Sequence, residues 1–266
     1  MPAKSRDPVT LAFLERYRIL RKGVKKGLKN FITLPNENNV HNLRNAFRRL
    51  NAAVAVIPRK VRSDSKDAKK YVERDRQILK LTSQVRDIDI ISERLKRCNN
   101  NPYGKTLLIS LKTKRRDGLK RPLREARKLS KRRVPSLKDR KLDGWIEAEI
   151  SKLRKGIEDH IQSTLSSDEN LDELHSLRKT IRKLRYTLEL LPDSKMRKRE
   201  IAGLAHWQDV LGDILECHIF ETYLASLNPT EFSKRSILEA RDSRKAKYRE
   251  LLDRPEHLGQ LGIKSQ

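Results

Sequence analysis

Residues His41–Pro58 read HNLRNAFRRLNAAVAVIP, and residues His175–Pro192 read HSLRKTIRKLRYTLELLP. Placed one over the other, the two stretches carry histidine, leucine, arginine and proline at the same spacings. The matched pairs are His41/His175, Leu43/Leu177, Arg44/Arg178, Arg48/Arg182, Leu50/Leu184 and Pro58/Pro192. Self-similarity of this kind indicates a fold that is built from copies of one unit.

The duplication continues upstream of these stretches. Leu20–Val24 (LRKGV) matches Leu153–Ile157 (LRKGI), in the same order and one residue out of step. We therefore predict two related units, residues 1–134 and 135–266, which are related by a pseudo-twofold axis.

Helical periodicity runs through the whole chain, because apolar residues recur at three- and four-residue steps. Prolines and polar clusters separate the periodic segments and predict eight helices and no strand. The expected ranges are 8–32, 40–57, 65–97, 105–133, 135–165, 168–191, 194–226 and 230–252. We expect Asp168 and Thr230 to cap the sixth and eighth helices, and the tail after Pro255 to be loosely held. The predicted fold is all-α, with two four-helix bundles.

Each repeated stretch presents two stripes when it is wound at roughly 100° per residue. The apolar stripes, which we expect to face the bundle cores, are Leu43, Phe47, Leu50, Val54 and Ile57, and Leu177, Ile181, Leu184, Leu188 and Leu191. Beside them run two His/Arg stripes: His41, Arg44 and Arg48 in the first copy, and His175, Arg178, Arg182 and Arg185 in the second. Side chains one turn apart lie roughly 5–6 Å from each other, so each His/Arg stripe offers stepped cations to a chain of phosphates.

The chain is strongly basic, with 62 Lys and Arg against 35 Asp and Glu, a formal charge of +27 and a pI of about 10.3. Such a charge favours anionic partners such as nucleic acid, acidic lipid or polyphosphate. Two plainer interpretations stay open: a solvated surface for the overall charge, and salt bridges or snorkelling side chains for the stripes. Retention of the same His and Arg spacing in two diverged copies favours anion binding.

The motifs together resemble the conserved-histidine α-helical domain (CHAD) family, and the resemblance covers nearly the whole chain. It rests on the two His-x-Leu-Arg-x-x-x-Arg segments, on Val85–Ile90 (VRDIDI) and on Leu211–Ile214 (LGDI). It implies a helical domain with a central basic groove or pore that binds inorganic polyphosphate and locates to polyphosphate granules. By this resemblance the phosphate-facing residues are His41, Arg44, Arg48, His175, Arg178, Arg182 and Arg185.

Arg21 and Arg154 match each other in the repeat and flank apolar helix faces, so we add them as second-tier phosphate ligands. The sequence departs from the family pattern at Asn51, which corresponds to Arg185 of the second copy, and at Glu216, where Asp is expected. We therefore expect the first stripe to bind more weakly than the second.

Three functions follow as alternatives. Non-catalytic polyphosphate binding is the first, and sequence-independent binding of nucleic acid, chiefly RNA, is the second. The third, a polyphosphate phosphatase or kinase, is disfavoured because no Gly-rich phosphate loop, carboxylate metal cluster or activated nucleophile is visible. Asp87 and Asp213 are interpreted as carboxylates that orient neighbouring Arg or His side chains, with an acid/base pair as the alternative. We expect no enzyme activity and no cofactor.

Metal and membrane sites are not indicated. The histidines outside the stripes and the two cysteines lack ligand spacing; they are His160, His206, His218, His257, Cys98 and Cys217. His218 is interpreted as a core histidine. Without a leader or a run of 18 apolar residues, we expect a cytoplasmic protein. The expected partner is polyphosphate, with weak nucleic-acid binding; no protein partner is indicated.

Overall fold

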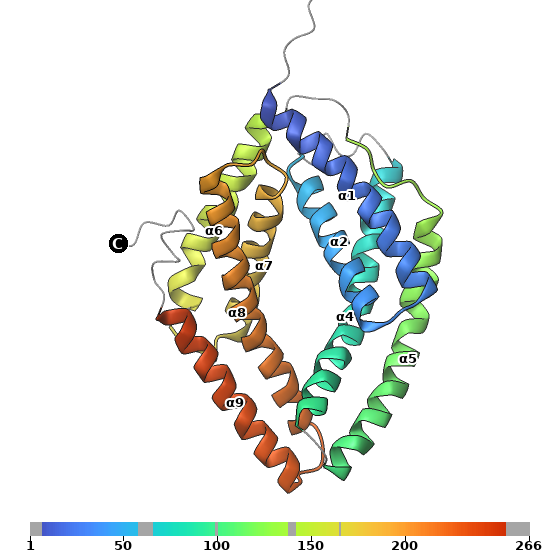
Figure 1. Ribbon diagram of the computed structural model, residues 1–266, viewed down its shortest axis with the longest axis vertical. Helices are drawn as coiled ribbons and strands as arrows, with labels where there is room; N and C mark the ends of the chain where they lie inside the picture. The colour runs from blue at the N-terminus through green and yellow to red at the C-terminus, as the bar shows by residue number, and fades with distance from the viewer. Residues whose placement is uncertain (1–6, 58–65, 99–100, 138–141, 165, 254–266) are drawn as a thin grey trace, which may run out of the picture. The chain divides into compact units, whose positions relative to one another are not determined.

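The structure, a computed structural model, describes residues 7–57, 66–98, 101–137, 142–164 and 166–253, and all regular structure in them is helical (Figure 1). The helices are α1 (Pro8–Thr33), α2 (Glu37–Ala55), α4 (Lys66–Arg97), α5 (Pro102–Ser130), α6 (Asp143–Thr164), α7 (Leu171–Leu188), α8 (Lys195–Ala225) and α9 (Glu231–Leu252). The predicted all-α fold is confirmed. The predicted helix stop at Pro58, the helix end at Leu165, His257 and the tail from Pro255 lie outside the described residues.

Capping side chains set two of the helix starts. Asp7 precedes Pro8 and accepts a hydrogen bond from the Thr10 amide at 2.9 Å, so α1 begins where predicted. Asn36 accepts from the Asn39 amide at 2.8 Å, which starts α2 three residues before the predicted Val40. The asparagine cap satisfies an amide that would otherwise have no partner within the helix.

Of three other predicted helix starts, one is observed and two differ from the prediction. Thr230 caps α9 as predicted, in a reciprocal capping box with Ser233. The predicted cap at Asp168 is wrong, because α7 begins at Leu171 and the Asp168 carbonyl and carboxylate both bind Arg244. The fifth helix also begins late, at Asp143 instead of residue 135.

The chain divides into two compact units that do not coincide with the predicted repeats. Unit 1 combines Met1–Thr82, Lys120–Lys155 and Lys183–Ile201, and unit 2 combines Ser83–Leu119, Gly156–Arg182 and Ala202–Gln266. Each unit therefore takes segments from both halves of the sequence. The boundaries at 1–134 and 135–266 describe the sequence repeat and stay a prediction.

Both predicted apolar stripes are buried. Every residue of the two stripes is at most 6% exposed. In unit 1, α1 lies against α2 (Figure 1) and adds Phe13, Tyr17, Val24, Leu28 and Phe31 to the core. The apolar residues of α2 recur every three or four positions because one face of the helix packs against the core, while the opposite face does not.

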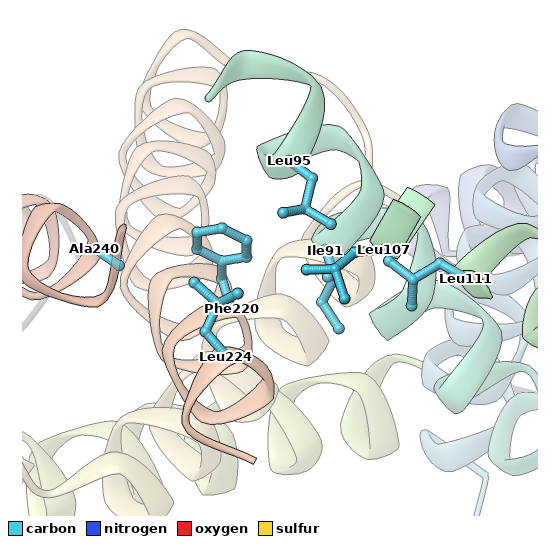
Figure 2. Packing of buried hydrophobic residues seen from close by; sticks show 7 residues of the cluster. All are labelled: Ile91, Leu95, Leu107, Leu111, Phe220, Leu224 and Ala240. Carbon is cyan, nitrogen blue, oxygen red and sulfur yellow. The ribbon is translucent and has the colours of Figure 1, made fainter. Parts of the chain in front are cut away.

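The core of unit 2 includes a cluster from four helices (Figure 2). Side chains of α4, α5, α8 and α9 meet there: Ile91, Leu95, Leu107, Leu111, Phe220, Leu224 and Ala240. Phe220 is 2% exposed, and burying such a ring stabilises the fold by about 1.5–3 kcal/mol. Separately, none of the described helices is long and apolar enough to cross a bilayer.

Candidate polyanion-binding residues

The first His/Arg stripe lies on α2, in unit 1. His41 is exposed, and its Nε2 lies 2.8 Å from the Asn45 side-chain nitrogen. Arg44 is only 7% exposed and donates from Nη1 to the Leu79 carbonyl at 2.6 Å and to the Thr82 hydroxyl at 2.8 Å. Arg48 is half-buried. The stripe therefore combines a fixed, buried arginine with more accessible neighbours.

The second stripe begins on the part of α7 that belongs to unit 2. His175 is exposed, and Arg178 and Arg182 are half-buried. Arg178 donates from Nε to the Gln208 carbonyl at 3.0 Å. Its guanidinium also lies against Gly212, where an added Cβ would be 2.9 Å from Nη2. The glycine of the Leu-Gly-Asp element therefore leaves room for the Arg178 guanidinium close to α8.

Arg44 and Arg178 are held at corresponding positions of the two copies. Thr82 lies five residues before Asp87 of the Val85–Ile90 motif, and Gln208 lies five residues before Asp213 of the Leu211–Ile214 motif. Arg44 donates a hydrogen bond to the side-chain hydroxyl of Thr82, whereas Arg178 donates to the backbone carbonyl of Gln208. The duplication thus extends from sequence spacing to the contacts of these side chains.

Arg185, the fourth residue of the second stripe, belongs to unit 1 and is held by local contacts. Its Nε lies 3.6 Å from a carboxylate oxygen of Glu189, and its guanidinium lies 5.0 Å from the centre of the Tyr186 ring. Arg49 lies 4.8 Å from the centre of the same ring and pairs with Glu189 at 3.0 Å. Arg49 was not predicted as a site residue. Tyr186 on α7 and Glu189, just after the end of α7, hold its guanidinium in place.

Asn51, where the first copy lacks the arginine, serves a buried carboxyl group. Its amide nitrogen donates to Asp75 at 3.1 Å, and Asp75 is completely buried. Burial raises the pKa of Asp75 to about 7, against the lowering effects of the Asn51 hydrogen bond and of Arg76. Burial also raises the pKa of the nearby Tyr71. An arginine at position 51 would therefore meet a different environment from that of Arg185.

The two second-tier residues differ in the charge of their partners. Arg21 is half-buried and donates to the Val134 carbonyl at 2.9 Å. Arg154 instead pairs with the carboxylate of Glu200 at 2.8 Å. A carbonyl leaves the positive charge of Arg21 in place, whereas Glu200 neutralises that of Arg154.

Several carboxylates of α4 and α8 form ion pairs with Arg or Lys side chains. Glu216, which departs from the family pattern, lies 3.2 Å from Arg86, and Asp213 lies 3.6 Å from Lys247. A further pair was not predicted from the sequence: Asp89 is 1% exposed and accepts a hydrogen bond from Arg115 at 2.6 Å. These contacts fit the interpretation of the acidic residues as partners for basic side chains.

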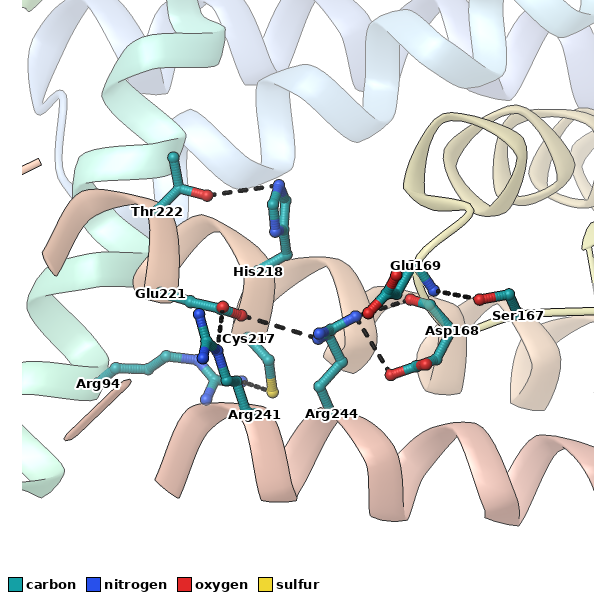
Figure 3. A network of polar contacts seen from close by, with 10 residues as sticks. All are labelled: Arg94, Ser167, Asp168, Glu169, Cys217, His218, Glu221, Thr222, Arg241 and Arg244. Carbon is teal, nitrogen blue, oxygen red and sulfur yellow. Dashed lines mark hydrogen bonds and ion pairs between the residues drawn. The ribbon is translucent and has the colours of Figure 1, made fainter. Parts of the chain in front are cut away.

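A polar network in unit 2 joins α8 and α9 to the segment before α7 (Figure 3). Arg244 binds the Asp168 carbonyl at 2.7 Å and lies 3.8 Å from Glu221, which pairs with Arg241 at 2.6 Å. Cys217 is buried, with Arg94 3.2 Å from its sulfur. The prediction that His218 is a core residue is wrong. Its side chain is half-exposed, and its Nε2 lies 3.4 Å from the Thr222 hydroxyl.

Unit 1 also has a small pocket of about 190 Å³ that the sequence did not indicate. Its lining comes from α1, α2 and the end of α7: Arg16, Ile19, Leu20, Arg49, Tyr186, Glu189 and Leu190. Arg16 is held there by the Glu189 and Leu191 carbonyls and by Asp193 at 2.7 Å. The arginines of this pocket are therefore paired with acidic side chains of the protein.

Comparisons with known proteins place these features in a family. The profile of the CHAD domain matches residues 18–225. The crystal structure of the CHAD domain from the plant Ricinus communis is similar over 100% of this chain and 95% of that chain, with a TM-score of 0.67 and 14% sequence identity. No curated protein sequence matches the chain significantly. The chain belongs to the CHAD domain family.

Proposed function

We propose that the chain binds inorganic polyphosphate, without catalysis, through the His/Arg stripes of α2 and α7. The observation that carries the proposal is the corresponding placement of Arg44 and Arg178, each fixed on the neighbouring helix. A guanidinium that is already oriented loses less conformational freedom when it binds a phosphate oxygen. The forked N–H donors of a guanidinium can bind two phosphate oxygens at once, whereas a lysine ammonium acts as a point charge.

The nine predicted residues have different roles within this proposal. Arg178 and Arg182 in unit 2, together with the exposed His175, are the residues that we expect to contact phosphate most directly. Arg154 and Arg185 already face carboxylates at 2.8 and 3.6 Å, so we expect weaker contributions from them. Arg44, Arg48, His41 and Arg21 form the corresponding set in unit 1. Polyphosphate granules in the cytoplasm are the proposed location.

The test compares two double variants that remove the same charge from unit 2. Arg178→Ala with Arg182→Ala removes two stripe residues, and Lys114→Ala with Arg116→Ala removes two exposed cations of α5. Binding of long-chain polyphosphate is measured at physiological salt, with circular dichroism to check helicity. Each lost charge-assisted hydrogen bond costs about 1.5–3 kcal/mol, so the stripe variant should bind at least tenfold more weakly.

A competition experiment separates polyphosphate from nucleic acid. Polyphosphate, RNA and duplex DNA compete for the wild-type chain at equal phosphate concentration. The proposal predicts that neither nucleic acid displaces polyphosphate. Displacement by RNA at comparable concentration, or equal affinity of the two double variants, would contradict it.

A further inference from the structure

The outer face of α1 carries a straight line of cations that the His/Arg stripes do not include. Arg18, Lys22, Lys25 and Lys29 follow the spacing i, i+4, i+7, i+11, and all four are exposed. At 3.6 residues per turn this spacing places them along one side of the helix. We call these four residues the α1 basic ridge.

The α1 basic ridge forms no ion pair within the described part of the chain. Between Glu15 and Glu37 the sequence has seven cations and no acidic residue. None of the four ridge residues makes an ion pair with a described carboxylate. Glu15 lies one turn before Arg18, but the two form no ion pair. By contrast, the exposed Arg235 and Arg97 each pair with a carboxylate one turn away.

The fold alone gives no reason for this arrangement. Like charges one turn apart destabilise a helix, and the ridge contains three such steps. The helix dipole does not compensate, because the last turn of α1 contains no basic residue. The opposite face of α1, with Phe13, Val24 and Phe31, is buried in the core. An unfavourable line of charge without ion pairs in the described chain indicates an anionic partner outside it.

The chemistry of the ridge restricts the kind of partner. A protein partner needs an apolar or aromatic centre of contact, and a stable membrane anchor needs side chains that insert. Ile19 is the one large hydrophobic residue of α1 between Arg18 and Lys29 that is mostly exposed, at 63%. A nucleic-acid backbone requires neither, since phosphate contacts from Lys and Arg supply its non-specific affinity.

We propose that the α1 basic ridge binds the phosphate backbone of a nucleic-acid duplex, without sequence preference. The ridge spans eleven residues, or about 16.5 Å at 1.5 Å per residue. Over that length of duplex axis each strand has about five phosphates, at roughly 3.4 Å of rise per phosphate. Because the strand winds around the axis, the ridge faces only part of this array. A duplex holds its phosphates in a rigid array, whereas a flexible polyanion must first be ordered before it can bind. This site is separate from the His/Arg stripes and does not depend on the proposed function.

The test uses two quadruple variants with identical loss of charge. The ridge variant replaces Arg18, Lys22, Lys25 and Lys29 with Gln, and the control replaces Arg116, Lys105, Lys112 and Lys114, exposed residues of α5. Binding of a 20-base-pair DNA duplex, a single strand of equal length and long-chain polyphosphate is followed by fluorescence anisotropy across salt concentrations. Circular dichroism verifies that both variants are folded.

The expected result is a loss confined to one variant and one ligand. Four phosphate contacts contribute about 3–4 to the slope of log affinity against log salt on duplex DNA. The ridge variant should lose that much slope and at least tenfold in duplex affinity, while the control changes less than threefold and polyphosphate binding is retained. Equal duplex affinity of the two variants, no binding by the wild type, or an equal loss for single strand or polyphosphate would overturn the proposal.

Discussion

Gly212→Ala tests the contact between α8 and Arg178 directly. Alanine is favoured over glycine inside a helix by roughly 0.8–1 kcal/mol, so the substitution alone should stabilise α8. The new Cβ, however, would lie 2.9 Å from Nη2 of Arg178 and 3.4 Å from its Nε and Cζ. The guanidinium must shift, and we expect this shift to break the hydrogen bond from Nε to the Gln208 carbonyl.

The two effects have opposite signs, and the larger one decides the outcome. A hydrogen bond from a charged donor contributes about 1.5–3 kcal/mol, which exceeds the helix-propensity gain. We expect Gly212→Ala to lower the free energy of unfolding by about 0.5–2 kcal/mol and to weaken polyphosphate binding as Arg178→Ala does. Urea unfolding followed by circular dichroism measures the first effect, and a polyphosphate titration the second.

Gly23→Ala is the matched control, because a Cβ at this exposed position of α1 would meet nothing within 4 Å. It should raise the free energy of unfolding by about 0.5–1 kcal/mol. The reasoning would be refuted if Gly212→Ala stabilised the chain as much as Gly23→Ala and left polyphosphate affinity unchanged. Arg178 would then adjust its position at no cost.

Three further predictions concern stability. Burial raises the pKa of Asp75 from 3.8 to about 7, so the folded chain holds a proton there that the unfolded chain releases. The free energy of unfolding therefore falls as pH rises from about 4 to 7, by on the order of 2–4 kcal/mol, and Asp75→Asn should remove the fall when pH 5 and 8 are compared by urea titration. Asp89→Ala should lower the free energy of unfolding by about 3–5 kcal/mol, because it leaves Arg115 without the buried carboxylate of its ion pair. Glu93→Ala, at an exposed pair, should lower it by under about 1 kcal/mol. Equal losses for the two variants in urea titration would contradict this prediction. Thr230→Ala should cost about 1 kcal/mol in chemical denaturation by removing a helix cap, and no change would mean that Ser233 suffices.

Helical periodicity gave a correct prediction wherever one helix face alone determined the outcome. The apolar stripes from Leu43 and Leu177 onward are buried because a 3.6-residue repeat places them on one side. Helix starts were less predictable. A side chain such as Asp168 can cap a helix or bind a distant residue, and here Arg244, 76 residues away, is its partner.

The contacts of the candidate site were beyond the reach of sequence reasoning for a related physical reason. The spacing placed Arg44 beside the core, but its partners are determined by which turn of α4 packs opposite it. The pairing of Asp89 with Arg115 likewise depends on how α4 and α5 meet. Periodicity describes one helix at a time, and these contacts join two.

The unlike chemistry that holds Arg44 and Arg178 has a genetic consequence. Thr82 contributes a side-chain hydroxyl, which a single codon change can delete, whereas the Gln208 acceptor is a main-chain carbonyl that every amino acid possesses. A substitution can therefore remove the hydroxyl acceptor at position 82 but cannot remove the carbonyl acceptor at position 208. Gln208 is only 9% exposed, so a library saturated at both codons should accept residues of similar volume at 208 and fewer still at 82, where the hydroxyl is also needed.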